Sequence, residues 1–184
     1  QSFAFNVLSS HDYQQVTAPQ IVKMFSLLTQ AATDMCAGQS IDLQQTNTLN
    51  TTKTETDVLL INLKEMHRLK TGALIKSAVL LGATCGNANE QEIEILSQYA
   101  DAIGLAFQVW DDVLDITSDT LTLGKPQGSD VAANKTTYPA LLGLDGARIK
   151  AKNLITQAVH ALQQLPYNTQ QLEQLAYYII ERDH

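Results

Sequence analysis

The sequence predicts an all-α protein that folds as a multi-helix bundle, and two observations lead to this prediction. Apolar residues recur at the three- and four-residue spacing of a helix in several long segments, and no segment shows the alternation typical of a half-buried strand. The chain has 184 residues, 45% of them apolar, which is enough for one domain with a substantial core. We therefore expect residues 1–184 to form a single helical domain.

The expected helices follow one another along the chain with polar connectors between them. Their apolar positions place them at about residues 19–37, 56–84, 89–117, 145–165 and 169–182, after an apolar helix end at 1–10 and with a short helix starting near Tyr138. Gly38 is expected to interrupt the first long helix, with a continuation through QSIDLQQ left open, and Gly72 to cause an irregularity in the next. The segment 118–137 contains two glycines and a proline and is expected to be a functional loop.

Three aspartates break the apolar pattern of the segment FQVWDDVLD. One helix face carries the polar residues at i, i+3, i+4 and i+7, which are Gln108, Asp111, Asp112 and Asp115. Residues 99–123 include no basic side chain, and two carboxylates a few ångströms apart repel by roughly 4 kcal/mol at an effective dielectric of about 20. We therefore expect a cation from elsewhere to neutralise this face, and oxygen ligands on a rigid helix suit Mg²⁺.

Lysines in three other segments complete a candidate anion site. The segment LGKPQGSD contains Lys125 and Asp130, and NKTTYP contains Lys135. In HRLKTGALI, Lys70 and Thr71 stand beside a glycine, where a kink can free a backbone carbonyl. The structural alternatives are an ordinary exposed loop and a lysine whose stem covers apolar surface while its head stays in water.

Composition argues against several classes of partner. The formal net charge is −7 and no basic run occurs, so we expect no nucleic-acid partner. No apolar stretch approaches the roughly 20 residues that span a bilayer, so stable membrane insertion is not expected. Cys36 and Cys85 lack a CxxC spacing, and the histidines show no ligand spacing. The cysteines suit a reducing cytoplasm, and zinc is not expected.

Five segments, in this order and spacing, carry a resemblance to a known family. GQSIDL, HRLKTGALI, IGLAFQVWDDVLDITSD, TLGKPQGSD and NKTTYPALLGL closely resemble the second half of trans-isoprenyl diphosphate synthases, the bacterial farnesyl diphosphate synthases in particular. The resemblance extends over essentially all 184 residues. It implies the isoprenoid (terpenoid) synthase fold, incomplete at the N-terminal side, with the chain forming the C-terminal part of a polyprenyl synthase domain, and it implies a homodimer.

The resemblance also implies a metal site. Asp111, Asp112 and Asp115 match the family's second aspartate-rich motif, in which the first aspartate binds Mg²⁺ that bridges to the allylic diphosphate. Mn²⁺ is the alternative ion. Asp130 matches an acid that reaches the metal through water.

Further roles follow for the residues around the substrate. Lys70, Lys125 and Lys135 match lysines that bind the allylic diphosphate. Thr71 and Gln108, together with the backbone carbonyl of Lys70, match groups that stabilise positive charge at the allylic carbon. Oxygen dipoles near that carbon and cations on the leaving group are what ionisation of an allylic C–O bond requires.

The implied activity is prenyl transfer in isoprenoid biosynthesis, in the cytoplasm. Dimethylallyl or geranyl diphosphate would condense with isopentenyl diphosphate by ionisation, condensation and elimination, giving farnesyl diphosphate and pyrophosphate. The family's first aspartate-rich motif and its isopentenyl-diphosphate-binding residues have no match here, so we expect these 184 residues alone to be inactive and product length to stay open. The alternatives are a geranyl or geranylgeranyl diphosphate synthase, a terpene cyclase, or a non-catalytic helical subunit of a prenyl synthase.

Overall fold

The computed structural model describes residues 2–10, 15–47, 55–118, 128 and 135–183. All regular structure within these residues is helical, which confirms the predicted all-α class. The elements are α1 (Ser2–Ser10), α2 (Ala18–Asn47), α3 (Thr56–His67), the π-helix η1 (Arg68–Gly72), α4 (Ala73–Cys85), α5 (Glu90–Thr117), α8 (Tyr138–Leu162) and α9 (Gln170–Glu181).

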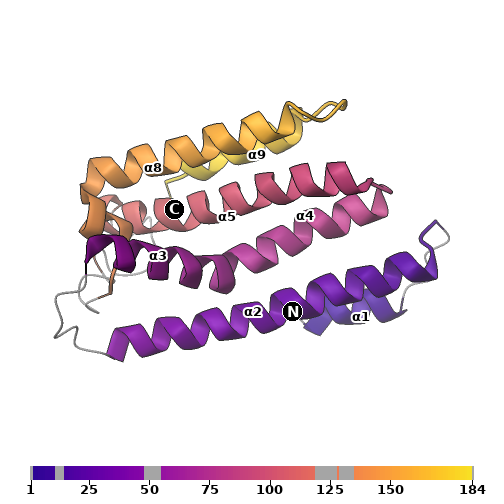
Figure 1. Cartoon of the computed structure of the whole chain (residues 1–184), viewed down its shortest axis with the longest axis horizontal. Helices are drawn as coiled ribbons and strands as arrows, with labels where there is room; N and C mark the ends of the chain where they lie inside the picture. The colour runs from indigo at the N-terminus through magenta and orange to yellow at the C-terminus, as the bar shows by residue number, and fades with distance from the viewer. Residues whose placement is uncertain (1, 11–14, 48–54, 119–127, 129–134, 184) are drawn as a thin grey trace.

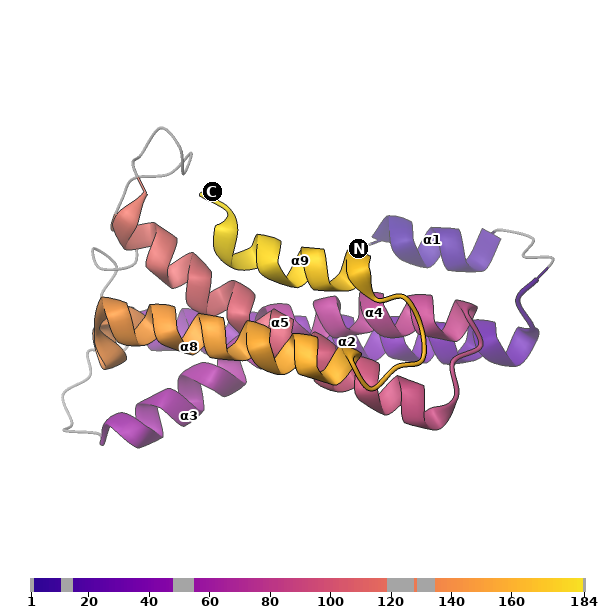
Figure 2. The ribbon, with the colours of Figure 1, turned by 90° about the horizontal axis from the view of Figure 1, so that it is seen from above.

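The helices stack in successive layers (Figure 1). α8 and α9 lie on one side, α5 follows, then α3 and α4, and finally α2 with α1. Seen from above (Figure 2), α3 runs at an angle to α4, and the two helices meet at η1. α5 is the central element, because it packs against α8, α9, α4 and η1.

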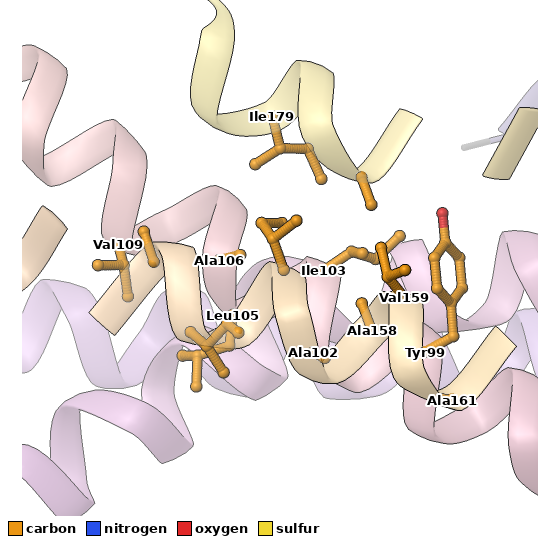
Figure 3. Close-up of a cluster of buried hydrophobic side chains, with 14 of the residues drawn as sticks. Tyr99, Ala102, Ile103, Leu105, Ala106, Val109, Ala158, Val159, Ala161 and Ile179 are labelled. Atoms are coloured by element: carbon orange, nitrogen blue, oxygen red, sulfur yellow. The ribbon is translucent and has the colours of Figure 1, made fainter. Parts of the chain in front are cut away.

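The core lies mainly between α5, α8 and α9, where Figure 3 shows their side chains meeting in one cluster. Small residues such as Ala106 and Ala158, both fully buried, let α5 and α8 approach closely. Tyr99 is also fully buried, and its hydroxyl donates a hydrogen bond of 2.8 Å to the Leu172 carbonyl of α9. Burial raises the pKa of the Tyr99 phenol to about 12.

The start of α5 is defined by a reciprocal cap. The Asn89 side chain accepts a 3.0 Å hydrogen bond from the Glu92 amide, and the Glu92 carboxylate accepts one of 2.8 Å from the Asn89 amide. This capping box satisfies two amides that a helix end leaves without intrahelical partners. The following 28-residue helix then carries the aspartates at its far end.

The interruption expected at Gly38 is wrong, because α2 continues through it to Asn47. Gly38 is the point at which α2 contacts the backbone of η1. A Cβ on residue 38 would lie 2.2 Å from the backbone nitrogen of Lys70. A mid-helix glycine costs about 1 kcal/mol in helix propensity. Glycine at this position lets α2 pack closely against η1, and this packing outweighs the cost in helix propensity. Gly38 therefore makes a tertiary contact and does not end the helix.

The irregularity expected at Gly72 is confirmed as a π-turn. The Ala73 amide bonds to the Arg68 carbonyl, five residues earlier, and regular helices continue on both sides. On the face toward α5, a Cβ on Gly104 would lie 3.1 Å from the Gly72 Cα. Gly38 of α2 and Gly104 of α5 therefore hold η1 between two helices at backbone contact distance.

The helix expected to start near Tyr138 is also present. α8 begins there, Thr137 accepts a 3.3 Å hydrogen bond from the Ala140 amide, and Pro139 occupies the first turn. Gly143 has φ 75° and ψ 162°, a backbone conformation that favours glycine. Gly143 separates the first turn of α8 from its long remainder. This matches the expectation of a short helix near Tyr138 followed by a long one from about residue 145.

No helix in the described part of the chain has the length and apolar character needed to cross a membrane.

Candidate active site

A cavity of about 250 Å³ opens where α2, the α3–η1 junction, α5 and the residues preceding α8 meet. Six residues that the sequence singled out line it together, from three separate segments: Lys70, Thr71, Gln108, Asp111, Asp112 and Lys135. The remaining lining residues are Asp42, Met66, His67, Thr136 and Thr137. The cavity therefore combines carboxylates, ammonium groups, an amide and hydroxyl groups.

Three further site residues were predicted from the sequence. Lys125 and Asp130 lie outside the described residues. Asp115 is 1% exposed and does not line the cavity, although it stands on the same face of α5 as Asp111. The Asp115 backbone carbonyl accepts a 2.8 Å hydrogen bond from the Gly128 amide.

Asp111 is the most accessible of the three aspartates. Its side chain is 40% exposed and forms an ion pair with Arg182, whose own side chain is only 10% exposed. Gln108 Nε2 donates a 3.3 Å hydrogen bond to Asp111 Oδ2. The cation that the acidic face required thus comes from the C-terminal end of the chain, 71 residues away.

Asp112 is buried and connects α5 to α8. Its Oδ2 accepts a 2.9 Å hydrogen bond from the backbone amide of Tyr138, the first residue of α8. A carboxylate at that position satisfies an otherwise free helix amide and interacts favourably with the positive end of the helix dipole. Burial, and then the charge of Asp112, raise the pKa of the Tyr138 phenol to about 12.

Lys70 is paired with an acid that sequence reasoning did not assign. Its Nζ lies 2.7 Å from Asp42 Oδ2, and the two side chains are 30% and 11% exposed. The sequence offered one indication of this role, because Asp42 is the one charged residue in the motif GQSIDL. The wider π-turn puts the consecutive side chains of Lys70 and Thr71 on the cavity together.

His67 is a second residue that sequence reasoning missed. It is buried, lines the cavity, and stacks on Tyr138 with ring centroids 5.9 Å apart. The histidines show no ligand spacing along the chain, so no pattern marked this one. Its position in the cavity wall arises from the packing of α3 against the start of α8.

The donor set fits a magnesium ion whose shell is shared with a ligand. In the described residues, no group of three or more histidine, cysteine, aspartate or glutamate side chains could hold a metal by itself. Asp111 and Asp112 nevertheless offer carboxylate oxygens to one cavity that Lys70 and Lys135 also line. Mg²⁺ usually keeps several waters and binds through one or two carboxylates plus substrate phosphates, and this wall suits that arrangement.

A larger hollow of about 440 Å³ lies elsewhere, between α5 and α8. Its polar lining includes Lys64, Asp101 and His160, and none of the residues predicted from the sequence borders it. Asp101 is engaged with Lys76 at 2.7 Å. The smaller cavity is therefore the better candidate, because it alone of the two combines neighbouring carboxylates with lysines from different elements.

Comparison with known proteins identifies the family. The model of the polyprenyl synthetase family matches residues 1–178. The chain is 45% identical over 189 aligned residues to farnesyl diphosphate synthase of Escherichia coli strain K12, an alignment that covers 100% of this chain and 60% of that protein.

Solved structures agree with this. A putative farnesyl-diphosphate synthase from Marinomonas sp. MED121 is 38% identical, with a TM-score of 0.76 and coverage of 98% of this chain and 59% of that one. A geranylgeranyl pyrophosphate synthetase from Pyrococcus horikoshii is 28% identical, with a TM-score of 0.82 and coverage of 98% and 64%. The chain thus spans about 60% of the length of such relatives. The family resemblance carried by the five motifs is confirmed, and the chain belongs to the polyprenyl synthetase family.

Proposed function

We propose that the protein containing these residues is a Mg²⁺-dependent prenyltransferase of isoprenoid biosynthesis. It condenses dimethylallyl or geranyl diphosphate with isopentenyl diphosphate to give farnesyl diphosphate and pyrophosphate. The observation that carries the proposal is that one cavity brings together lysines, carboxylates, an amide and hydroxyl groups: Lys70, Lys135, Asp111, Asp112, Gln108 and Thr71. The names of the relatives, farnesyl and geranylgeranyl diphosphate synthases, support the same class of reaction.

The chain's cationic groups act on the diphosphate. Lys70 and Lys135 bind its oxygens, and Lys125 is proposed as a third such lysine. Asp111 and Asp112 would hold Mg²⁺, or Mn²⁺, with Asp115 and Asp130 as the proposed remainder of the site. When bound, the ion supplies positive charge that stabilises the leaving pyrophosphate.

The oxygen dipoles act on the carbocation. The allylic C–O bond breaks with its electron pair going to the diphosphate, and the alkene of isopentenyl diphosphate attacks the resulting cation before a proton is lost to pyrophosphate. Gln108 Nε2 donates to Asp111, which leaves the amide oxygen of Gln108 as the group that faces positive charge. Thr71 and the Lys70 carbonyl complete this set at the π-turn.

The proposal includes the assembly and its place in the cell. We take the chain as the C-terminal part of a longer synthase domain, and the enzyme as a cytoplasmic homodimer that binds prenyl diphosphates. Exposed apolar side chains on α1 and α2, Phe3, Val22 and Leu43, are suited to a subunit interface. Sedimentation velocity of the purified protein distinguishes a dimer from a monomer.

The decisive experiment is an assay of the longer protein with dimethylallyl diphosphate, and in parallel with geranyl diphosphate, together with labelled isopentenyl diphosphate and Mg²⁺. Chain length of the product separates a C15 from a C10 or C20 synthase. Asp111→Ala is expected to lower kcat/KM by about 10²-fold or more, because it removes charge stabilisation at the leaving group. Asp145→Ala removes a carboxylate that is 91% exposed and serves as the control. Unchanged turnover in Asp111→Ala would favour the non-catalytic subunit.

A further inference from the structure

The C-terminal segment crosses the aspartate-bearing end of α5. After α9, the Arg182 carbonyl accepts a 3.2 Å hydrogen bond from Trp110 Nε1, and the Asp183 carbonyl accepts one of 3.0 Å from the Ser118 hydroxyl. Figure 1 shows the C-terminus beside α5. Two backbone positions in succession are thus attached to the helix that presents Asp111.

The Arg182 side chain continues this attachment at the acidic face. Its guanidinium carbon lies 4.1 Å from the centroid of the Phe107 ring, and its Nη2 donates to the Phe107 carbonyl at 3.4 Å. Arg182 Nε donates to the Ile179 carbonyl at 3.2 Å. The guanidinium is therefore oriented from three sides, with its charge on the Asp111 carboxylate.

Both carboxylate oxygens of Asp111 are engaged in this arrangement. Oδ1 accepts from Arg182, and Oδ2 accepts from Gln108. A divalent cation that binds Asp111 therefore meets a carboxylate that already accepts from a guanidinium and an amide. Repulsion between a guanidinium and a divalent ion a few ångströms apart acts on Arg182 and leaves the neutral amide in place.

We propose that Arg182 is a latch: it occupies Asp111 in the metal-free protein, and binding of the metal and diphosphate expels it and releases the C-terminal segment from α5. This inference rests on the proposed function in one respect, the role of Asp111 as a metal ligand. The latch stabilises the metal-free acidic face and raises the metal concentration needed to occupy it, because the ion must compete with the resident guanidinium.

The first test uses the chain's single tryptophan. Trp110 donates to the Arg182 carbonyl, so release of the segment changes its surroundings. MgCl₂ is titrated into the purified chain with inorganic pyrophosphate, while binding is followed by calorimetry and Trp110 emission by fluorescence. We expect the Trp110 emission maximum to shift to longer wavelength. The MgCl₂ concentration at the midpoint of this shift should equal that at the midpoint of the calorimetric titration. Heat of binding with no change in emission would overturn the latch and leave the proposed metal site standing.

The second test compares two arginine variants with equal loss of charge. Arg182→Gln is expected to bind Mg²⁺ and pyrophosphate with a half-saturation about fivefold lower than wild type, since the competing charge is gone. Arg148→Gln is the control, because Arg148 pairs with an exposed acid on α8 at 3.6 Å. An unchanged or higher half-saturation in Arg182→Gln would contradict the latch.

A third variant tests the metal ligand that this inference shares with the proposed function. Asp111→Asn should abolish binding that wild type shows; if it binds normally, Asp111 is not a ligand and both ideas fail. Absence of binding by wild type and by Arg182→Gln would overturn the metal site of this chain and the latch with it, whereas the proposed function is tested separately by the assay of the longer protein. Far-UV circular dichroism of each variant establishes that it is folded, and the wild-type fluorescence titration decides the latch without any substitution.

Discussion

The ion pair between Lys70 and Asp42 joins two helices at the cavity wall. With side chains 30% and 11% exposed, the pair is more shielded from water than most surface pairs, and removing one partner leaves a largely buried charge. In the proposed reaction Lys70 must bind a diphosphate, so its position is set by Asp42 before any ligand arrives. This is a residue-scale interaction that holds a substrate-binding cation in place.

A double-mutant cycle measures this interaction. Asp42→Asn, Lys70→Met and the double variant are unfolded in urea, and the expected coupling is about 1 to 2 kcal/mol. The control cycle uses Glu65 and Arg68, a half-exposed pair at 2.7 Å, for which about 0.5 kcal/mol is expected. Equal coupling in the two cycles would show that the Lys70 pair is an ordinary surface contact.

Tyr99 predicts how stability depends on pH at the alkaline end. Its pKa is raised to about 12 by burial, so the folded state retains a proton that the unfolded chain releases near pH 10. The contribution of this retained proton to the free energy of unfolding is complete below pH 10. As the pH rises toward 12 the contribution is lost, which lowers the free energy of unfolding by about 2 to 3 kcal/mol for this side chain. Tyr138, also raised to about 12, acts in the same direction.

The corresponding variant is Tyr99→Phe. At pH 8 it should be less stable by about 1 to 2 kcal/mol, because the part-buried Leu172 carbonyl loses this hydrogen bond. Near pH 11.5 the difference should shrink or reverse, since phenylalanine does not ionise. Urea unfolding at both pH values measures this, with the half-exposed Tyr177→Phe as control. A constant difference at the two pH values would refute the account.

At the scale of elements, the π-helix η1 depends on two glycines from its neighbours. α2 approaches it through Gly38 and α5 through Gly104, and both contacts are to backbone. Backbone atoms cannot move aside as the end of a flexible side chain can. The positions of Lys70 and Thr71 therefore follow from helix packing on both sides of η1.

Gly38→Ala tests this packing. The added Cβ would lie 2.2 Å from the backbone nitrogen of Lys70 and 2.6 Å from its Cα. α2 and η1 must therefore move apart, which is expected to lower the free energy of unfolding by about 2 to 3 kcal/mol. Gly82→Ala on α4 is the matched control, because no atom lies within 4 Å of its added Cβ. That variant should be neutral or up to about 1 kcal/mol more stable. Similar stabilities for the two variants would contradict the close contact.

At the scale of the whole molecule, the described residues provide one aspartate-rich wall. The sequence contains a single DDxxD motif, and the chain spans about 60% of its relatives' length. One wall supplies Asp111 and Asp112 to the cavity, and the described residues place no second DDxxD motif opposite it.

We therefore expect the 184-residue chain alone to show no turnover. Purified chain incubated with geranyl diphosphate, isopentenyl diphosphate and Mg²⁺ should give no product above background, while the longer protein gives a prenyl diphosphate. The intact mass of each preparation, against 20.2 kDa for these residues, confirms which protein was assayed. Product from the 184-residue chain would show that one aspartate-rich wall suffices.

The sequence by itself determined the helices, the family and much of the cavity. Apolar spacing is a local property, and it located the long helices and the irregularity at Gly72. The spaced motifs then identified six residues that prove to share one cavity.

Tertiary structure alone decided which partners those residues have. Arg182 neutralises Asp111, Asp42 holds Lys70, α2 continues through Gly38, and Asp115 is buried away from the cavity. Helical periodicity specifies which residues share a face but not which distant segment covers that face. That choice depends on how whole helices pack, and it brings together side chains 28 and 71 residues apart.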